Sequence, residues 1–594
     1  MENYLKIAQE EEQRWQDAYD NIVEAIKLTT RYADEDFKEA KRLTQELVSM
    51  RREEDQQQIM SDEAVAHGLS RLREGQLNKL ELLLEQPYFA RLECEENGKR
   101  FSFYLGMASF PKKRIIDWRE APIAKLYYEY NEGDDYSDEI AGLYREGQII
   151  VRRGFKGKGR ELYLIECPHG QIIKQKGEWK YHPYQVDNQG SRIRSRAHAQ
   201  SHYLPPILSL ITADQYAMIT SEVDKPLLIE GIAGSGKTTV ALHRLAWLLH
   251  NKNSQAKAAR SFVLVFNQIL KLYIKECLPE LGLKDVKVLT YSEWVHERLR
   301  EARVSLPNHP HSQQELTQVL CAAYEQGKLG VTADHLVVDE IQDLSPQALQ
   351  VLTQAVASNH CLTLVGDFGQ QIIEGGKLHS FKEVVDTLGL NHKSLVELHL
   401  SFRSTKQILE LAQHVRHDGK LPEEASQGVF VGPEPEFIQL ESEQDYIFAI
   451  QDWIADIKQH YPHNHSAILC RTPKDARHIF QNLQNLGTSG LRLGEEHSFS
   501  FEPGLTVTSI EHVKGLEFRN VLIANPSDEH YRDNSRLDRN LLYVAITRAE
   551  EHLDFLLKDQ PTPLLPMDHW HTKTIKRENQ EELEWLENWA QEKD

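Results

Sequence analysis

The sequence predicts an α/β protein in which a helical arm and a small β-rich domain precede a long α/β region. Three observations predict this fold class. The N-terminal residues carry apolar side chains at helical spacing, and the segment after Pro87 alternates short apolar or aromatic stretches with Gly, Asn and Asp. From about Pro205 onward, strands and helices alternate around a glycine-rich loop, which is the pattern of parallel sheets covered by helices.

Composition places the chain among large globular proteins. It has 594 residues, of which 40% are hydrophobic and 27% are charged, and no apolar run reaches the length of a bilayer span. The first residues lack the basic end and apolar stretch of a secretory signal, so we expect a cytoplasmic protein with no membrane partner. The net charge of -21 disfavours a broad basic surface for nucleic acid and is compatible with a local groove.

Residues 1–87 predict a helical coiled-coil arm. Apolar residues between Trp15 and Ile26 follow one another at steps of four, three and four, so residues 2–32 are expected to form one helix. Apolar runs further on predict helices that fold back on it. We place the first turn near residues 33–36, whose sequence Ala-Asp-Glu-Asp would form an acidic tip. The arm holds 12 Lys and Arg against 20 Asp and Glu. An ordinary hairpin with solvated charges is the alternative interpretation.

The segment 88–203 predicts a β-rich domain that ends in a linker. Stretches such as 101–105 and 161–165 have the composition of strands and are separated by turn residues. At the other end of the chain, residues 561–594 are expected to form a tail that ends in a short acidic helix over 579–594.

A phosphate-binding loop is the strongest functional signal in the sequence. An apolar stretch leads into G-x-x-x-x-G-K-T, and an amphipathic helix follows at once, which is the context that this motif requires. The glycines let backbone N–H groups converge on phosphates, Lys237 places a charge on the β- and γ-phosphates, and Thr238 offers its hydroxyl to Mg²⁺. ATP and Mg²⁺ are the predicted cofactors. The predicted nucleotide-binding residues of the loop are Gly231, Ile232, Ala233, Gly234, Ser235, Gly236, Lys237, Thr238 and Thr239.

Hydrolysis also requires a carboxylate for the metal and a group that activates water. A Val-rich strand at 335–338 is followed by Asp339 and Glu340. We expect Asp339 to hold Mg²⁺ together with Thr238, and Glu340 to orient or deprotonate the attacking water. Two adjacent carboxylates are usually a solvated strand end. Their place behind a buried strand, downstream of the phosphate loop, favours catalysis instead.

Three further polar residues are candidates for the same site. Gln370 follows another apolar strand and is a candidate sensor of the γ-phosphate. Arg403 and Arg548 are candidates, with Lys237, for neutralising charge that develops on the transferred phosphoryl group. Chemistry alone does not single out these arginines, because most arginines are surface charges.

The order of the motifs resembles that of superfamily 1 motor ATPases of the UvrD/Rep type. The sequences TADQ, the phosphate loop, LVFN, LTYS, DEIQD, VGDFGQ, LSFRS, TSIEHVKGLEF and YVAITRA follow one another over roughly residues 205–555. The resemblance implies two RecA-like P-loop domains, at 204–399 and 400–560, with ATP in the cleft between them. The LVFN and LTYS motifs line the strand path in that family.

The same resemblance implies roles for individual residues in binding ATP. Gln215 would read adenine, and Arg244 and Phe402 would sandwich the base. Glu517 would contact the ribose, and the two candidate arginines would act as arginine fingers from the second domain.

The arm and the sequence Asp-Trp-Arg-Glu-Ala-Pro at 117–122 add a second resemblance, to HelD-type ATPases. These relatives of DNA helicase IV bind bacterial RNA polymerase, push an acidic-tipped arm into its secondary channel and use ATP to release stalled enzyme. The resemblance implies RNA polymerase as a partner. The chain departs from the family in two places: Glu120 interrupts the usual D-W-R-A-P run, and residues 295–332 are too short for the second arm that larger members carry.

Two features predict weak strand separation. Helicases of the UvrD/Rep type carry a Tyr and a Trp after the third motif, whereas this chain has Gln-Ile-Ile-Glu-Gly-Gly-Lys at 371–377. Stacking of a base on an aromatic side chain contributes roughly 1–3 kcal/mol, so the grip on a single strand is reduced. The segments 295–332 and 406–500 are also shorter than the duplex-handling subdomains of full helicases.

The leading hypothesis is therefore an ATP-hydrolysing motor that remodels or recycles bacterial RNA polymerase. The alternative is a 3′–5′ DNA helicase or translocase in repair or defence, whose partner is single-stranded DNA. A third hypothesis is an ATP-gated clamp with slow hydrolysis, against which the complete set of hydrolytic residues argues.

Overall fold

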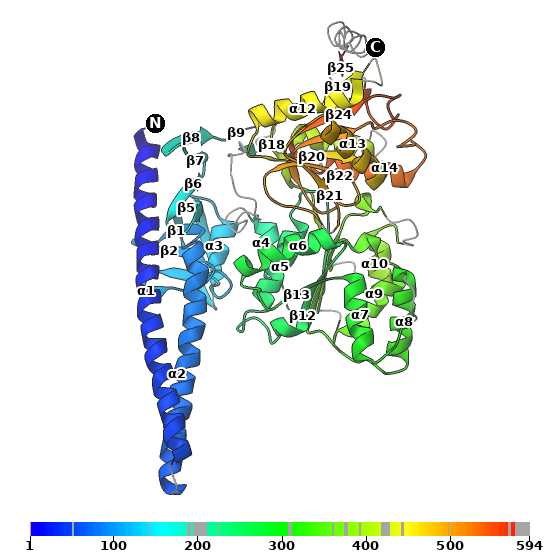
Figure 1. The fold of residues 1–594 in the computed structure, drawn as a ribbon. Helices are drawn as coiled ribbons and strands as arrows, with labels where there is room; N and C mark the ends of the chain where they lie inside the picture. The colour runs from blue at the N-terminus through cyan, green and yellow to red at the C-terminus, as the bar shows by residue number, and fades with distance from the viewer. Residues whose placement is uncertain are drawn as a thin grey trace, which may run out of the picture.

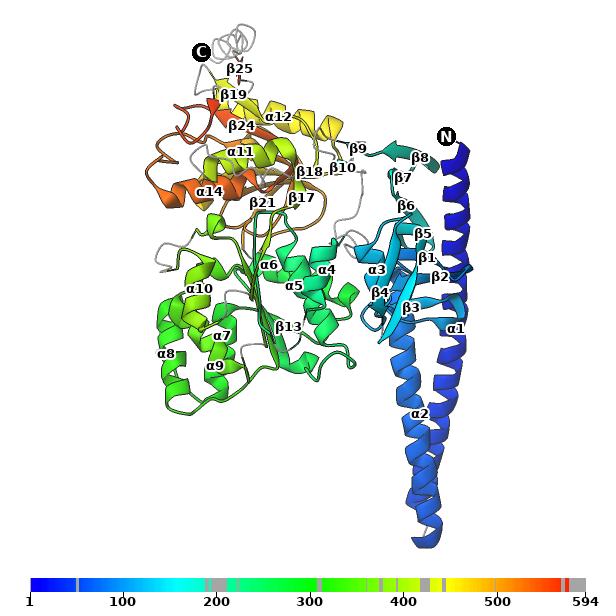
Figure 2. The same cartoon turned by 180° about the vertical axis from the view of Figure 1, so that it is seen from behind.

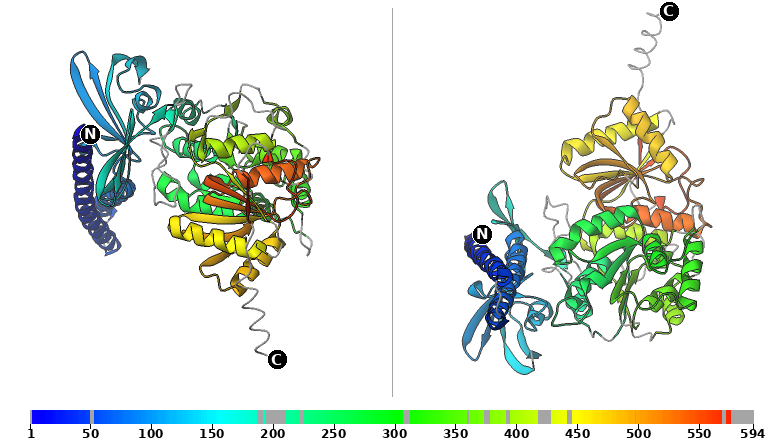
Figure 3. Two further views of the ribbon diagram at one scale, coloured as in Figure 1. Left: turned by 90° about the horizontal axis from the view of Figure 1, so that it is seen from above. Right: turned by 60° about the horizontal axis from the view of Figure 1, so that its bottom comes forward.

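The chain folds into an arm, an antiparallel sheet and two α/β domains (Figure 1, Figure 2). The computed structural model describes residues 2–49, 53–140, 142–186, 192–193, 211–221, 223, 225–306, 312–358, 361–372, 378–390, 394–416, 428–440, 445–496, 498–567 and 572–575. The arm and the antiparallel sheet lie together on one side of the molecule, and the α/β domains lie on the other (Figure 3).

The arm consists of two long helices, α1 (Glu2–Ser49) and α2 (Glu53–Glu85), whose distal ends project beyond the rest of the molecule (Figure 1). The predicted turn at residues 33–36 is wrong, because α1 continues through it. That stretch contains no Gly or Pro, and an Arg31–Glu35 ion pair of 3.1 Å spans one helical turn across it. Asp36 therefore lies along the side of the arm, 3.6 Å from Arg73 of α2. The two helices connect through residues 50–52, outside the described residues.

The arm packs on a mainly antiparallel sheet with the strand order β3-β2-β1-β5-β6-β7-β8, in which β4 pairs with β5. The predicted strands at 101–105 and 161–165 lie within β2 and β6. The elements of this N-terminal sheet are β1 (Ala90–Glu96), β2 (Lys99–Gly106), β3 (Ile115–Asp117), α3 (Ala124–Glu129), β4 (Asp135–Ile140), β5 (Leu143–Lys158), β6 (Glu161–Cys167), β7 (Gly170–Gln175) and β8 (Glu178–Pro183). A short pair, β9 (Gln185–Val186) and β10 (Arg192–Ile193), follows.

The first α/β domain, residues 211–398, contains a parallel sheet with the order β13-β12-β14-β15-β11-β16. Helices cover it on both sides (Figure 1). Its elements are α4 (Ala213–Ile219), β11 (Leu227–Gly231), α5 (Lys237–Leu248), β12 (Ser261–Val265), α6 (Gln268–Cys277), β13 (Lys287–Thr290), α7 (Tyr291–Glu301), α8 (Gln313–Glu325), β14 (His335–Val338), α9 (Pro346–Ala355), β15 (Leu362–Gly366), α10 (Phe381–Leu388) and β16 (Leu395–Leu398). The central strands are buried on both faces, which explains their continuous Leu and Val runs.

The second α/β domain, residues 401–575, contains a parallel sheet with the order β21-β22-β20-β23-β24-β19-β25 and a short pair, β17 with β18. Its elements are β17 (Ser401–Thr405), α11 (Lys406–Arg416), β18 (Gly428–Phe430), β19 (Glu436–Leu440), α12 (Tyr446–His460), β20 (His465–Cys470), α13 (Pro473–Asn485), β21 (Leu491–Gly494), β22 (Gly504–Ser509), β23 (Phe518–Ala524), α14 (Arg536–Ile546), β24 (Ala549–Leu557) and β25 (Thr572–Ile575). The predicted acidic helix at 579–594 lies outside the described residues.

The predicted α/β fold class with a helical arm is thus confirmed. Within the described residues, no helix combines the length and the apolarity needed to cross a lipid bilayer.

Candidate nucleotide-binding site

The phosphate loop joins β11 to α5, as its sequence predicts. Gly234 and Gly236 adopt φ values of 76° and 82°, in the left-handed region that favours glycine. A β-carbon on Gly234 would lie 2.4 Å from Cβ of Arg403, so the second domain packs directly on the loop. Lys237 is buried, and its Nζ donates to the carbonyls of Gly231 (2.8 Å) and Ile232 (3.0 Å). Burial lowers the pKa of this ammonium group.

The acidic pair follows β14 and faces the start of α5. The Thr238 hydroxyl donates to Oδ2 of Asp339 at 2.7 Å, so the two side chains that the sequence proposes as Mg²⁺ ligands lie together. Burial and the neighbouring Glu340 raise the pKa of Asp339 to about 6. A hydroxyl and a carboxylate are hard oxygen donors that suit Mg²⁺. Thr238 and Asp339 would hold the ion, which would neutralise charge on the phosphates when bound.

Glu340 occupies an unusual backbone conformation beside Asp339. Its φ of 55° is in the left-handed region, which costs a non-glycine residue of order 1–3 kcal/mol. Its Oε2 accepts a hydrogen bond from the side-chain amide of Gln342. The carboxylate is 8% exposed and lines the same cavity as Lys237 and Asp339.

The two candidate arginines lie on the opposite wall of this cavity. Arg403 extends from β17 and forms a 2.5 Å ion pair with Glu517. Arg548 follows α14, is 1% exposed, and donates to Oε1 of Gln370 (3.0 Å) and the carbonyl of Leu516 (2.9 Å). Burial, with the charge of Arg403, lowers the pKa of Arg548 to about 10.

Cations from both α/β domains therefore line one interdomain cavity, whose lining includes Lys237, Arg403 and Arg548. The carboxylates of Asp339, Glu340 and Glu517 line the same cavity and offset part of this charge. Cations that converge from both domains can neutralise charge that develops on a phosphoryl group.

Gln370 is held from two sides at the edge of the cavity. Its side-chain nitrogen donates to Oδ2 of Asp367 (3.0 Å), while its oxygen accepts from Arg548. Asp367 is fully buried and forms a 3.1 Å ion pair with Arg416 of the second domain. Burial opposes ionisation of Asp367, but the charges of Arg416 and Lys237 outweigh it and lower its pKa. Sequence reasoning did not single out Arg416, and its position in α11 gave no signal.

The residues predicted to recognise the base and the sugar do not all line this cavity. Gln215 of α4 is 4% exposed, closes a capping box with Thr212, and donates to the Ser235 carbonyl of the phosphate loop at 3.1 Å. Glu517 lines the cavity. The described cavity lining includes neither Arg244 nor Phe402.

Arg244 has a different local role. It is 1% exposed, and its Nη1 donates to the carbonyls of Met218 (3.1 Å) and Ser221 (3.1 Å) at the C-terminal end of α4. Phe402 is half-buried, and its backbone N–H donates to the Gly234 carbonyl at 2.9 Å. The sandwich of the base between Arg244 and Phe402 stays a prediction.

A second cavity lies behind the acidic pair. Its lining includes Phe266 after β12, Thr290 and Ser292 around the start of α7, and Asp343. These residues belong to or adjoin the LVFN, LTYS and DEIQD sequences. Residues 373–377, which replace the expected aromatics, lie outside the described residues.

Comparisons with known proteins agree with this arrangement. The family model for the N-terminal domain of DNA helicase IV HelD matches residues 8–166, an AAA domain model matches 214–376, and the UvrD-like helicase C-terminal domain model matches 504–555. No curated protein matched the chain.

Two solved structures show limited similarity. The C-terminal domain of a possible DNA helicase from Lactobacillus plantarum WCFS1 is 22% identical, with a TM-score of 0.25, over 30% of this chain and 99% of that one. The DEAD-box helicase Mss116, bound to single-stranded RNA and UDP-BeF, is 14% identical, with a TM-score of 0.40, over 63% of this chain and 76% of that one.

Proposed function

The chain is a UvrD-like superfamily 1 ATPase of the HelD type, and we propose that it uses ATP hydrolysis to remodel or recycle bacterial RNA polymerase through its helical arm. The observation that carries this proposal is the firm attachment of a long projecting arm to the domain that holds the phosphate loop. Such an attachment lets closure of the nucleotide cleft move the arm relative to the second α/β domain.

The base of the arm is fixed to the N-terminal sheet by buried contacts. Trp15 of α1 is fully buried, and its indole N–H donates to the Gly159 carbonyl at 3.0 Å. A β-carbon on Gly157 would lie 2.5 Å from the indole ring, so the ring lies directly on the backbone of β5. The buried Glu11 carboxylate also pairs with Arg91 (2.6 Å) and Arg153 (2.5 Å) of the sheet. Removing one partner of such a buried pair is strongly destabilising.

The N-terminal sheet is in turn packed against the first α/β domain. Tyr128 of α3 stacks on Tyr216 of α4 with ring centroids 4.2 Å apart. The sheet and this domain share one apolar core, which includes Phe89, Trp118 and Leu245. Helix α4 also carries Gln215, whose side chain donates to the phosphate loop. The same helix therefore contacts both the phosphate loop and the unit that holds the arm.

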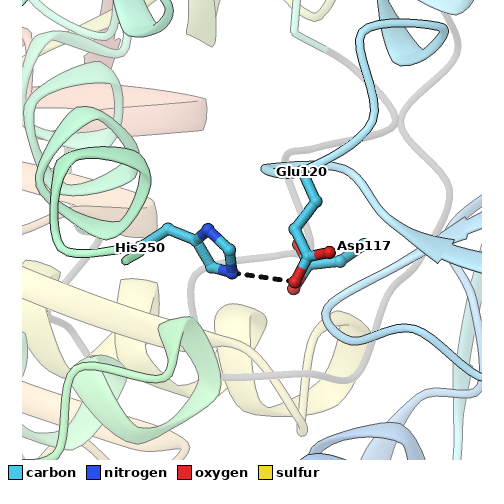
Figure 4. A group of neighbouring side chains, drawn as sticks. All are labelled: Asp117, Glu120 and His250. Atoms are coloured by element: carbon cyan, nitrogen blue, oxygen red, sulfur yellow. Dashed lines mark ion pairs between the residues drawn. The ribbon is translucent and has the colours of Figure 1, made fainter. Parts of the chain in front are cut away.

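Polar contacts around Glu120 strengthen the same junction (Figure 4). Glu120 pairs with Nε2 of His250 (3.0 Å) and with Lys252 (2.8 Å), which follow α5. Asp117 lies beside them and pairs with Arg119 at 2.7 Å. The residue that departs from the D-W-R-A-P run therefore contacts the first α/β domain. Arg119 and Lys252 pair with the two carboxylates, so the cluster joins the N-terminal sheet to the first α/β domain.

Charge also fits the proposed partner. Residues 1–87 hold 20 Asp and Glu against 12 Lys and Arg, although the sequence at the connection has both signs, with Arg51 and Arg52 followed by Glu53, Glu54 and Asp55. An acidic arm favours association with a basic channel and disfavours nucleic acid. A polymerase partner would place the protein in the cytoplasm.

A shortened arm tests the proposal. The variant lacks residues 33–72 and joins Tyr32 to Arg73 through a short Gly-Ser linker. These residues are neighbours, since the Arg73 guanidinium lies 5.3 Å from the Tyr32 ring centroid. The variant keeps Glu11 and Trp15, so the sheet remains covered. Both chains are used to capture RNA polymerase from a bacterial lysate, with the full-length Glu340→Gln variant as a binding control without turnover.

We expect the full-length chain and Glu340→Gln to recover polymerase and the shortened variant to lose it. ATP added to the full-length complex should release polymerase from a stalled template, and Glu340→Gln should not support release. Failure of the full-length chain to recover polymerase contradicts the proposal.

A 3′–5′ helicase or single-strand translocase is the second candidate function. The cavity lined by Phe266, Thr290 and Ser292, beside Asp339, favours it because these residues lie where the family guides a strand. Single-stranded DNA should then stimulate ATP turnover many-fold in both the full-length and the shortened chain. Polymerase should stimulate turnover only in the full-length chain if the first proposal holds.

A further inference from the structure

Lys514 is a fully buried lysine in the loop between β22 and β23 of the second α/β domain. The next residue, Gly515, has a φ of 87°, and a β-carbon there would lie 3.0 Å from Leu270 of α6. The loop thus approaches the first α/β domain so closely that a side chain at position 515 would require Leu270 to shift. Burying an ammonium group without partners is very costly, so the surroundings of Lys514 require an explanation.

The described partners of Lys514 come from the first α/β domain. Its Nζ forms a hydrogen-bonded ion pair with Asp343 and donates to the carbonyl of Gln370 at 2.7 Å. The ammonium group also lies 4.8 Å from the ring centroid of Phe266, which is within the range of a cation–π interaction. Asp343 is itself 5% exposed, and burial raises its pKa although Lys514 opposes that shift. A cation of one domain is therefore buried in a set of acceptors of the other.

This interdomain contact reaches the candidate catalytic carboxylate. Nζ of Lys514 lies 3.7 Å from Oε2 of Glu340, the same oxygen that accepts from the Gln342 amide. Gln342 is fully buried, and its own oxygen accepts from the backbone N–H of Asp367 at 3.1 Å. The position of Oε2 is thus set by an amide of the first domain and by an ammonium group of the second.

We propose that Lys514 is a positioning residue for ATP hydrolysis, which holds the Glu340 carboxylate in its reactive orientation only while the two α/β domains are closed on each other. Glu340 starts from a left-handed backbone conformation that its surroundings must maintain. When the cleft opens, the Lys514 ammonium group moves away with the second domain. Only the Gln342 amide is then left to hold the Glu340 carboxylate. Hydrolysis is thereby restricted to the closed state, in which Arg548 also contacts Gln370.

The alternative is that Lys514 only neutralises the buried Asp343. A set of three variants separates the two roles: Lys514→Met, Asp343→Asn and the double variant. Lys514→Met leaves Asp343 buried and unpaired, so a loss of stability is expected from either role. In the double variant both charges are replaced by neutral side chains of similar size, which is often close to neutral for stability. Steady-state ATP turnover and thermal unfolding of the full-length protein are measured for each.

We expect Lys514→Met to lower kcat by about 100-fold, because a misplaced catalytic group costs about that much. The KM for ATP should change by less than about threefold, since ground-state binding is retained. The double variant should regain the unfolding temperature of the wild type but not its kcat.

A double variant that regains the kcat of the wild type overturns the proposal, as does a Lys514→Met variant with unchanged kcat. If Lys514→Met does not fold, the double variant alone decides between the roles. The inference rests on Glu340 as the activating group, which Glu340→Gln checks separately. It requires ATP turnover only, so its failure is distinguishable from failure to bind polymerase.

Discussion

His243 links the stability of the first α/β domain to pH. It lies on α5, behind the phosphate loop, and is 4% exposed. Its Nδ1 lies 2.8 Å from the Thr239 carbonyl, and its ring lies 6.1 Å from that of Trp118 in the N-terminal sheet unit. Burial lowers its pKa from 6.5 to about 4. The folded protein therefore holds this imidazole neutral under conditions in which the unfolded chain protonates it.

The sign and size of the effect follow from this difference. The stability due to neutral His243 is fully present above pH 6.5 and is lost as the pH falls from 6.5 towards 4, because only the unfolded chain takes up the proton. Lowering the pH from 7.5 to 5 takes the solution about 1.5 pH units below the unfolded pKa of 6.5. This lowers the free energy of unfolding by about 2 kcal/mol. For a domain of this size, that is a decrease of about 4–8 °C in unfolding temperature.

The assay compares unfolding temperatures of the wild type, His243→Gln and His296→Gln across this pH range. His296 is a matched control, because its Nδ1 lies 2.7 Å from the Ser292 carbonyl one turn earlier in α7, but its side chain is exposed. His243→Gln should lower stability at pH 7.5 and show a shallower decline towards pH 5. His296→Gln should follow the wild type. Parallel curves for the wild type and His243→Gln would refute the reasoning.

Three further predictions concern the catalytic site and the arm. Glu340→Gln should lower ATP turnover by about 10²–10⁴-fold while a fluorescent nucleotide still binds, and retained turnover would mean that another group activates water. Arg403→Ala and Arg548→Ala should each lower kcat by about 10³-fold or more, measured at a temperature at which the variant is folded. An unchanged kcat would exclude an arginine-finger role. Trp15→Ala should cost about 3–5 kcal/mol at the base of the arm, because it removes a fully buried indole. Limited proteolysis should then cut α1 faster than in Leu28→Ala, which truncates an apolar side chain of α1 that is 47% exposed, and equal rates would contradict the packing argument.

The arm shows where sequence reasoning succeeds and where it stops. Its helical periodicity was readable because apolar residues recur locally, and Trp15 is indeed buried. The turn was misplaced at residues 33–36 because charged residues alone do not end a helix. Without Gly or Pro, and with a supporting Arg31–Glu35 pair, the helix continues.

The candidate catalytic site divides in a similar way. The proximity of Thr238 and Asp339 could be predicted, since the phosphate loop and Asp339 each follow a buried strand and such strand ends meet at one edge of a parallel sheet. The local role of Arg244 could not, because its acceptors on α4 are defined by how two helices pack. Lys514 stood inside a recognised motif, but nothing in its neighbours along the chain indicated that it is buried against Asp343.

The sequence by itself determined the chemistry that resides in short contiguous segments: glycines that permit a left-handed loop, apolar strands that end in carboxylates, and the periodicity of the arm. Only the tertiary structure decided which distant groups meet. Lys514 and Asp343 are 171 positions apart, and Tyr128 stacks on Tyr216 across two domains. Such contacts depend on the packing of whole domains, for which local patterns carry no periodic signal. The same packing joins the arm to the nucleotide-binding domain.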